Sequence, residues 1–174
     1  MPFAYYDKLT AGQKRTYRKS DTIRRIDIPD IASLMPLAAA IGPALETQEP
    51  RHVQRACQAL VDAANARMQA PPVAMRVLAR RPSNSWGELQ GLYEPDEVTG
   101  GVARITLWMR TAQREQVVKF RTFLRTLVHE LCHHFDYEHY RLEETFHTEG
   151  FYARESALMR ELLGEASGRA QSTP

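Results

Sequence analysis

The chain has 174 residues, of which 43% are hydrophobic and 25% charged, so it can bury one core and is too short for two full domains. Its formal net charge is +2, an excess too small to demand a polyanionic partner. Two cysteines, Cys57 and Cys132, exclude a disulfide framework and a four-cysteine metal site. No apolar run could cross a bilayer and the start has no leader pattern, so we expect a cytoplasmic protein.

Composition along the chain predicts one globular domain with extensions at both ends. Residues 1–48 are expected to form a basic N-terminal arm and a connection, and residues 49–164 the folded domain. Residues 165–174 are small and polar, which predicts a disordered tail.

The N-terminal arm contains one clear helix signal. Thr10 and Gln13 form a capping box, which predicts a short basic helix over Thr10–Ile23. The stretch after it, residues 26–50, is interrupted by Pro and Gly and predicts an irregular connection with one short helix.

Hydrophobic periodicity predicts the elements of the folded domain. Spacings of three and four indicate helices, alternation indicates strands, and Pro, Asp and Gly between two strands indicate a hairpin. The predicted order is a helix over 53–68, strands over 73–79, 85–94 and 102–110, and helices over 115–140 and 147–164. This order predicts an α+β fold with a small antiparallel or mixed sheet.

His129, Glu130 and His133 form an HExxH pattern within a predicted helix, where residues four apart share a face. At about 100° per residue, these three side chains project opposite the apolar face of the helix. The helix should therefore pack its back on a core and present them to a cleft. His134 and Cys132 project elsewhere, and we expect both to be structural neighbours.

A metal site that keeps an open position needs a third protein ligand, and two histidines compete for it. His139 has the spacing of the metzincin signature, but Asp136 occupies the position where that motif has a helix-breaking glycine. Without a break, His139 would point roughly 80–120° away from the ligand pair. His147 opens the last predicted helix and can reach back to the cleft. We favour His147 and keep His139 as the alternative.

HExxH within a helix, a third His in "HTEGF" and a preceding strand that ends in "RITL" resemble the SprT-like, or Spartan-type, metallopeptidase domain. The likeness covers residues 49–163 and includes the order of the elements. It implies a zincin-like fold, in which a small sheet packs on the active-site helix, with one zinc ion held by His129, His133 and His147 and with Glu130 as catalytic base. The family's frequent C-terminal zinc ribbon is missing, and "HTEG" replaces the usual His-Gly beginning.

The predicted function is hydrolysis of peptide bonds in a protein or peptide substrate, in which Glu130 takes a proton from a zinc-bound water. The alternative is a non-catalytic, zinc-stabilised interaction module. Glu155, two turns after His147, is either a surface acid or a carboxylate that orients a ligand imidazole. The substrate would lie along a sheet edge, which is either Trp86–Glu94 or Val102–Arg110.

Residues 1–25 carry seven basic and two acidic side chains, with Tyr5, Tyr6 and Tyr17 among them. Such a segment predicts weak DNA association, because aromatic rings stack on bases while cations meet phosphates. The alternative, which the small net charge favours, is a helix that packs its tyrosines on the domain.

Overall fold

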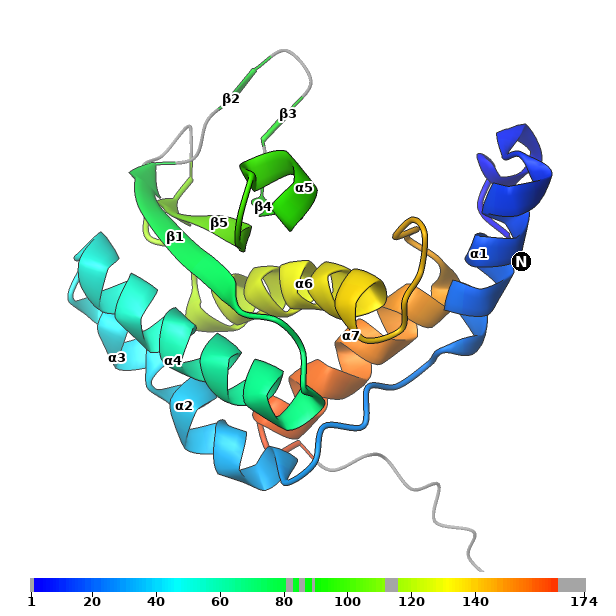
Figure 1. Cartoon of the computed structure of the whole chain (residues 1–174). Helices are drawn as coiled ribbons and strands as arrows, with labels where there is room; N and C mark the ends of the chain where they lie inside the picture. The colour runs from blue at the N-terminus through cyan, green and yellow to red at the C-terminus, as the bar shows by residue number, and fades with distance from the viewer. Residues whose placement is uncertain (1, 81–82, 85–86, 89, 112–115, 166–174) are drawn as a thin grey trace, which may run out of the picture.

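The computed structural model describes residues 2–80, 83–84, 87–88, 90–111 and 116–165, and its fold is α+β (Figure 1). The helices are α1 (Ala11–Thr22), α2 (Met35–Ala39), α3 (Ile41–Glu46), α4 (Pro50–Met68), α5 (Asp96–Thr99), α6 (Phe120–Glu138) and α7 (Glu149–Leu162). The strands are β1 (Val73–Arg80), β2 (Ser83–Asn84), β3 (Gly87–Glu88), β4 (Gly91–Glu94) and β5 (Ala103–Arg110). None of the helices in these residues combines the length and apolar character needed to cross a membrane.

The main sheet is small and mixed, with strand order β1-β5-β4. Strand β5 pairs in parallel with β1 and antiparallel with β4, so it is the central strand. The predicted antiparallel pairing of the second and third strand-like runs is therefore found for Gly91–Glu94, while residues 85, 86 and 89 lie outside the described part. In the main sheet, β4 has a neighbouring strand on one side only, which makes it an edge strand.

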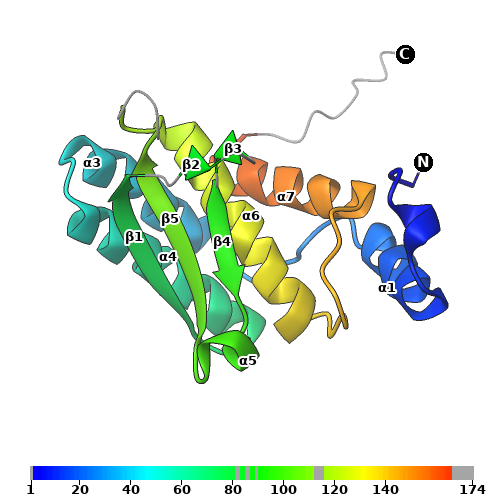
Figure 2. The same ribbon diagram turned by 90° about the horizontal axis from the view of Figure 1, so that it is seen from above.

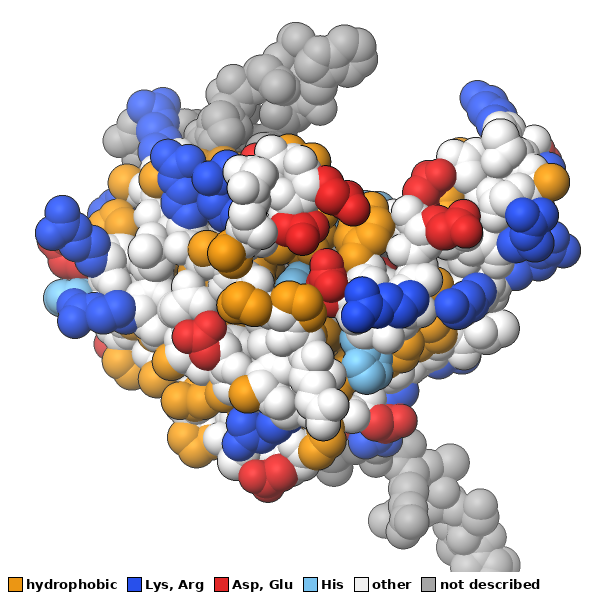
Figure 3. All heavy atoms as spheres, viewed as in Figure 1, with side chains coloured by type: hydrophobic (Ala, Val, Ile, Leu, Met, Phe, Trp, Pro, Cys, Tyr) orange, Lys and Arg blue, Asp and Glu red, His pale blue; other side chains and the backbone are white. Residues whose placement is uncertain are grey.

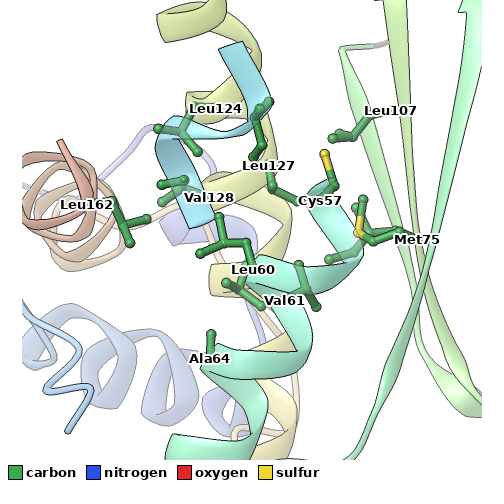
Figure 4. Packing of buried hydrophobic residues seen from close by; sticks show 14 of the residues in the cluster. Cys57, Leu60, Val61, Ala64, Met75, Leu107, Leu124, Leu127, Val128 and Leu162 are labelled. Atoms are coloured by element: carbon green, nitrogen blue, oxygen red, sulfur yellow. The ribbon is translucent and has the colours of Figure 1, made fainter. Parts of the chain in front are cut away.

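Helices α4 and α6 pack against the sheet and enclose the core between them (Figure 4). Both helices contribute to the core the apolar side chains that periodicity predicted, and β1 contributes every second side chain from Val73 to Val77. Ala79, predicted on the buried face of β1, is exposed near the end of the strand. The core includes Cys57, Leu60, Val61, Ala64, Met75, Leu107, Leu124, Leu127, Val128 and Leu162. Burial of each large apolar side chain contributes about 1.5–3 kcal/mol to folding.

The connection between α1 and α4 is more helical than the sequence suggested, since it holds α2, α3 and a 3₁₀ turn over Ile31–Leu34. Pro36 lies in the first turn of α2 and Pro50 in the first turn of α4. Proline is tolerated there because the first amide groups of a helix have no intrahelical acceptor. Pro36 and Pro50 therefore mark helix starts rather than breaks. Apolar residues of this connection join the main core, namely Ile26, Ile28, Leu34, Ala38, Ile41 and Leu45.

Helix α1 has the predicted capping box, in which Thr10 Oγ1 accepts from the Gln13 amide and Gln13 Oε1 accepts from the Thr10 amide. The helix packs against α7 and contributes the buried Tyr17, which contacts Phe146 just before α7. Figure 2 shows the resulting order across the molecule: β1, β5, β4, α6, α7 and finally α1. Helix α6 begins at Phe120, five residues later than expected, because Val117 and Val118 still pair with the end of β5. Residues 166–174, most of the predicted tail, lie outside the described part.

Candidate metal centre

Two helices bring three histidines to one point. Helix α6 runs unbroken to Glu138, so His129 and His133 lie one turn apart on the same face. His147 precedes α7, whose N-cap Thr148 accepts a hydrogen bond from the Phe151 amide and fixes where the helix starts. The Nε2 atoms lie 3.2 Å apart between His129 and His133, 3.0 Å apart between His129 and His147, and 3.1 Å apart between His133 and His147. The three rings could therefore hold a metal ion.

The other histidines of α6 do not join this triangle. Asp136 is helical and does not break α6, and His139 is the exposed residue that caps its C-terminal end. His134 is fully buried, with Nε2 3.0 Å from the carbonyl oxygen of Pro71 and Nδ1 3.2 Å from the Tyr93 hydroxyl. Cys132 is also fully buried, as expected for a thiol that packs as a small apolar group.

The distances between the three Nε2 atoms fit an ion with tetrahedral coordination. Three nitrogens bound at about 2.0–2.1 Å with tetrahedral angles lie about 3.3–3.4 Å from one another. The observed separations of 3.0–3.2 Å are slightly shorter. Small outward rotations of the rings would therefore be enough to admit the ion.

His129 is oriented by Glu155, which the sequence left as either a surface acid or an orienting group. The Glu155 side chain is 6% exposed, and its Oε2 lies 2.7 Å from His129 Nδ1. Its other oxygen accepts from Arg125 at 3.2 Å. A carboxylate only accepts, so His129 Nδ1 carries the hydrogen, and Nε2 of the neutral ring presents a lone pair.

His133 is oriented by Thr145, which no short motif marked. Thr145 Oγ1 lies 2.7 Å from His133 Nδ1 and 2.7 Å from Asp136 Oδ2. The Asp136 carboxylate accepts the hydroxyl hydrogen, so Thr145 must in turn accept a hydrogen from His133 Nδ1. Nε2 of neutral His133 is therefore bare as well. Two bare nitrogens 3.2 Å apart cannot hydrogen-bond to each other, and a cation between them would relieve their repulsion.

Burial favours the neutral, metal-binding form of His133 and His147. Burial, together with the neighbouring His129 and His147, lowers the pKa of His133 to about 2. Burial also lowers the pKa of His147, with a further contribution from His129. Neutral imidazoles rather than imidazolium ions are the ligands of metals, so both rings are ready to bind at neutral pH.

Glu130 lies beside the triangle and under the edge strand. It is 6% exposed, and burial raises the pKa of its carboxyl to about 7 in the metal-free protein. His129 and a hydrogen bond from the Tyr93 amide oppose this rise, while Glu155 adds to it. Gly91 of β4 faces the same carboxylate closely. The HExxH motif placed Glu130 in the cleft, and no sequence pattern indicated that β4 covers it.

The three histidines and Glu130 line a cleft of about 580 Å³. Leu92 and Tyr93 of the edge strand β4 line the cleft, and so do Tyr137 and Tyr152. The surface is hollowed between the sheet side and the N-terminal side, and hydrophobic side chains are visible in the hollow (Figure 3). Tyr140 donates to the carbonyl oxygen of Arg25 and does not line the cleft.

The N-terminal arm reaches the same region. Tyr17 is 2% exposed and makes edge contacts with Tyr5 and Tyr6, so these tyrosines pack on one another. The Tyr5 hydroxyl donates to the carbonyl oxygen of His147 at 3.0 Å. Lys and Arg side chains lie on the outer surface of this part of the molecule (Figure 3). The arm therefore contacts the segment that carries the third histidine.

Comparison with protein-family models, with curated proteins and with solved structures found no match for this chain. The resemblance to the SprT-like metallopeptidase domain thus rests on the HExxH motif, the later histidine and the order of the elements. The geometry of the site supplies independent ground for a functional proposal.

Proposed function

We propose that this protein is a zinc-dependent metallopeptidase that hydrolyses peptide bonds in protein or peptide substrates. The observation that carries the proposal is the triangle of Nε2 atoms, 3.0–3.2 Å apart, in the same cleft as the buried Glu130. Neither feature alone would be sufficient. Together they supply a metal position that is open to a substrate and a carboxyl group beside it.

Zinc is proposed because of the type and number of donor atoms. Three imidazole nitrogens suit zinc and other late transition metals, whereas magnesium and calcium prefer oxygen ligands. Zinc held by three protein ligands retains a fourth position for chemistry. When bound, zinc supplies Lewis-acid polarisation of a carbonyl group and lowers the pKa of water to about 7.

Glu130 would act as the general base and then as the general acid. Its carboxylate accepts a proton from the attacking water and later delivers it to the leaving amine. A pKa of about 7 in the metal-free protein supports both roles, although a nearby dication would lower it and favour the accepting form. The Tyr93 amide holds the carboxylate in place.

The substrate would bind along β4, the alternative that sequence analysis had assigned to Trp86–Glu94. Strand β5 is excluded as the edge because it pairs on both sides. An extended peptide could add to β4 through main-chain hydrogen bonds, which give affinity with little demand on side chains. The apolar surfaces of Leu92, Tyr137 and Tyr152 would then contact substrate side chains.

The test measures zinc content and peptidase activity together on wild type, Glu130→Gln and the control Glu143→Gln, which changes an exposed glutamate. Glu130→Gln should retain zinc and lose about 10²–10⁴-fold in activity, the contribution typical of general acid–base catalysis. The control should retain both. Activity retained in Glu130→Gln would remove this residue from the mechanism. Wild type that binds zinc but cleaves no unfolded substrate would favour the interaction module, and wild type without zinc would overturn both.

A further inference from the structure

A buried chain of polar contacts connects the N-terminal helix to the candidate metal centre. It runs from α1 through Arg154 and Asp136 to Thr145, and from there to His133. We infer that Arg154, Asp136 and Thr145 are positioning residues that hold His133 in the tautomer and orientation needed for metal binding, and that α1 anchors them. This inference rests on the metal site of the proposed function and is independent of peptide hydrolysis.

The anchor at α1 consists of main-chain and side-chain oxygens. Arg154 is fully buried, and its Nη1 donates to the carbonyl oxygens of Ser20 at 3.0 Å and Ile23 at 2.9 Å. Its Nη2 donates to Ser20 Oγ at 3.0 Å. The last turn of α1 therefore satisfies guanidinium hydrogens that would otherwise be buried without acceptors.

The next link is an ion pair with no exposed surface. Arg154 Nη2 lies 2.7 Å from both carboxylate oxygens of Asp136, and both side chains are 0% exposed. Burial raises the pKa of the Asp136 carboxyl, while Arg154 and Thr145 oppose that rise. Removal of two charges from water is expensive, so such a pair adds little stability compared with apolar residues. The ion pair instead fixes the position of the Asp136 carboxylate, which holds it against the Thr145 hydroxyl.

Thr145 needs this support because it lies between α6 and α7, outside any helix or strand. Without the Asp136 carboxylate, its hydroxyl could equally donate to His133 Nδ1. That arrangement would place the imidazole hydrogen on Nε2, where it would block the metal. The ion pair thus determines which way the hydroxyl points, and the hydroxyl determines the tautomer.

Other contacts from the N-terminal residues converge on the same segment. Gln13 donates to Glu144 at 3.0 Å, and Asp21 Oδ1 accepts from the Gly150 amide at 2.8 Å. Together with the Tyr5 bond to His147, these contacts brace the chain on both sides of the third histidine. The N-terminal helix is in this sense part of the metal centre, although it contributes no ligand.

The decisive comparison is between Thr145→Val, which removes the hydroxyl at nearly constant shape, and Thr145→Ser, which retains it. Thr126→Val is the matched control, because Thr126 lines the same cleft but donates only to the Thr122 carbonyl. Affinities for Zn²⁺ and Co²⁺ are measured by competition with a chelator, and the visible spectrum of bound Co²⁺ reports the ligand geometry. Imidazole ¹⁵N shifts of the metal-free proteins report the tautomer of His133.

Thr145→Val should bind Zn²⁺ about 10–100-fold more weakly than wild type, the loss typical when a residue that orients a ligand is removed. It should also lose the Nδ1–H tautomer, whereas Thr145→Ser and Thr126→Val should stay close to wild type. Equal affinities and shifts in Thr145→Val and wild type would overturn the inference. So would a loss of affinity in Thr145→Ser or Thr126→Val as large as that in Thr145→Val.

The same experiment separates this inference from the proposed function. If wild type binds neither metal, the metal centre fails. The ¹⁵N shifts still test the hydrogen-bond relay in that case, because the relay is a property of the metal-free chain. If wild type binds zinc with His133 in the Nε2–H tautomer before metal addition, the metal centre stands and the relay fails.

Discussion

Gly91 of β4 and Glu130 of α6 lie so close that a Cβ atom on Gly91 would be 2.5 Å from Oε1 of the carboxylate. The same atom would be 2.8 Å from a methyl group of Thr126 and 2.9 Å from Cγ of Glu130. Contacts this short are repulsive, so the edge strand can approach α6 only because residue 91 has no side chain. The cleft wall and the carboxylate are therefore positioned by the same glycine.

Gly91→Ala is predicted to displace Glu130 and leave the metal ligands in place. Peptidase activity should fall by about 100-fold, the effect typical of a misplacement of about 1 Å at a catalytic group. Zinc affinity should be unchanged. Gly101→Ala is the control, because no atom lies within 4 Å of its Cβ position. Measurements of kcat/KM and zinc affinity check this, and unchanged activity in Gly91→Ala would contradict the positioning of Glu130 by β4.

The buried carboxyl of Glu130 predicts a pH-dependent stability in the metal-free protein. Its pKa is raised from 4.5 to about 7, so the folded state favours the protonated form. Stability from this group is fully present below the unfolded pKa and is lost as pH rises through the folded one. Glutamine at position 130 does not titrate. The unfolding free energy of Glu130→Gln minus that of wild type should therefore increase by up to about 3 kcal/mol as pH rises from 4 to 8.

Denaturant unfolding at a series of pH values, with a chelator present, measures this difference. Exposed Glu46→Gln provides the comparison and should give a curve parallel to wild type. A difference between Glu130→Gln and wild type that stays constant with pH would show that the carboxyl is not desolvated in the folded state.

The ligand assignment predicts that alanine at His129, His133 or His147 strongly reduces zinc binding. The loss should exceed the about 10–100-fold change that follows removal of a residue that only orients a ligand. His139→Ala should bind zinc as wild type does, because His139 is exposed at the end of α6. Zinc content after dialysis is the measurement. The opposite pattern for His139 and His147 would restore the metzincin-like alternative.

Gly150→Ala is predicted to separate α1 from α7. A Cβ atom on Gly150 would overlap the main chain of Asp21, which cannot move aside as a flexible side chain could. The expected loss is about 1–3 kcal/mol of unfolding free energy, as for other overpacked sites, with weaker zinc binding. Gly12→Ala, in α1 itself, meets no atom closer than 3.6 Å and should cause neither change. Thermal unfolding and zinc titration of the two variants check the prediction.

Helical phasing predicted that His129 and His133 lie close together, because it depends on local geometry. Residues 129 and 133 share a face wherever the chain is helical, and the apolar residues of α6 fall on the opposite side of the helical wheel. The same phasing argued against His139, and His147 was preferred because it opens the last predicted helix and can reach back to the cleft. The capping box at Thr10 was predictable for a similar reason, since its two hydrogen bonds span only three residues.

The relay and the close approach of Gly91 were not predictable because they join residues distant in the chain. Arg154 meets Ser20 across 134 positions, and no periodicity marks such a pair. The prolines near α2 and α4 led to the wrong prediction of an irregular connection, since a proline can either follow the end of one helix or begin the next.

Association of residues 1–25 with DNA stays a prediction. Neutralisation of exposed arginines in this segment would test it more cleanly than deletion of α1.

Two of the proposed ligands lie in α6 and the third, His147, lies just before α7, so an ion held by His133 and His147 would act as a cross-link. These residues are 14 positions apart. Closure of a loop of about this length by a covalent bridge reduces the entropy of the unfolded chain by an amount equivalent to about 3 kcal/mol. Zinc would then fasten residues 140–146 to the rest of the fold, and a chelator should make this segment the first point of cleavage by an added protease.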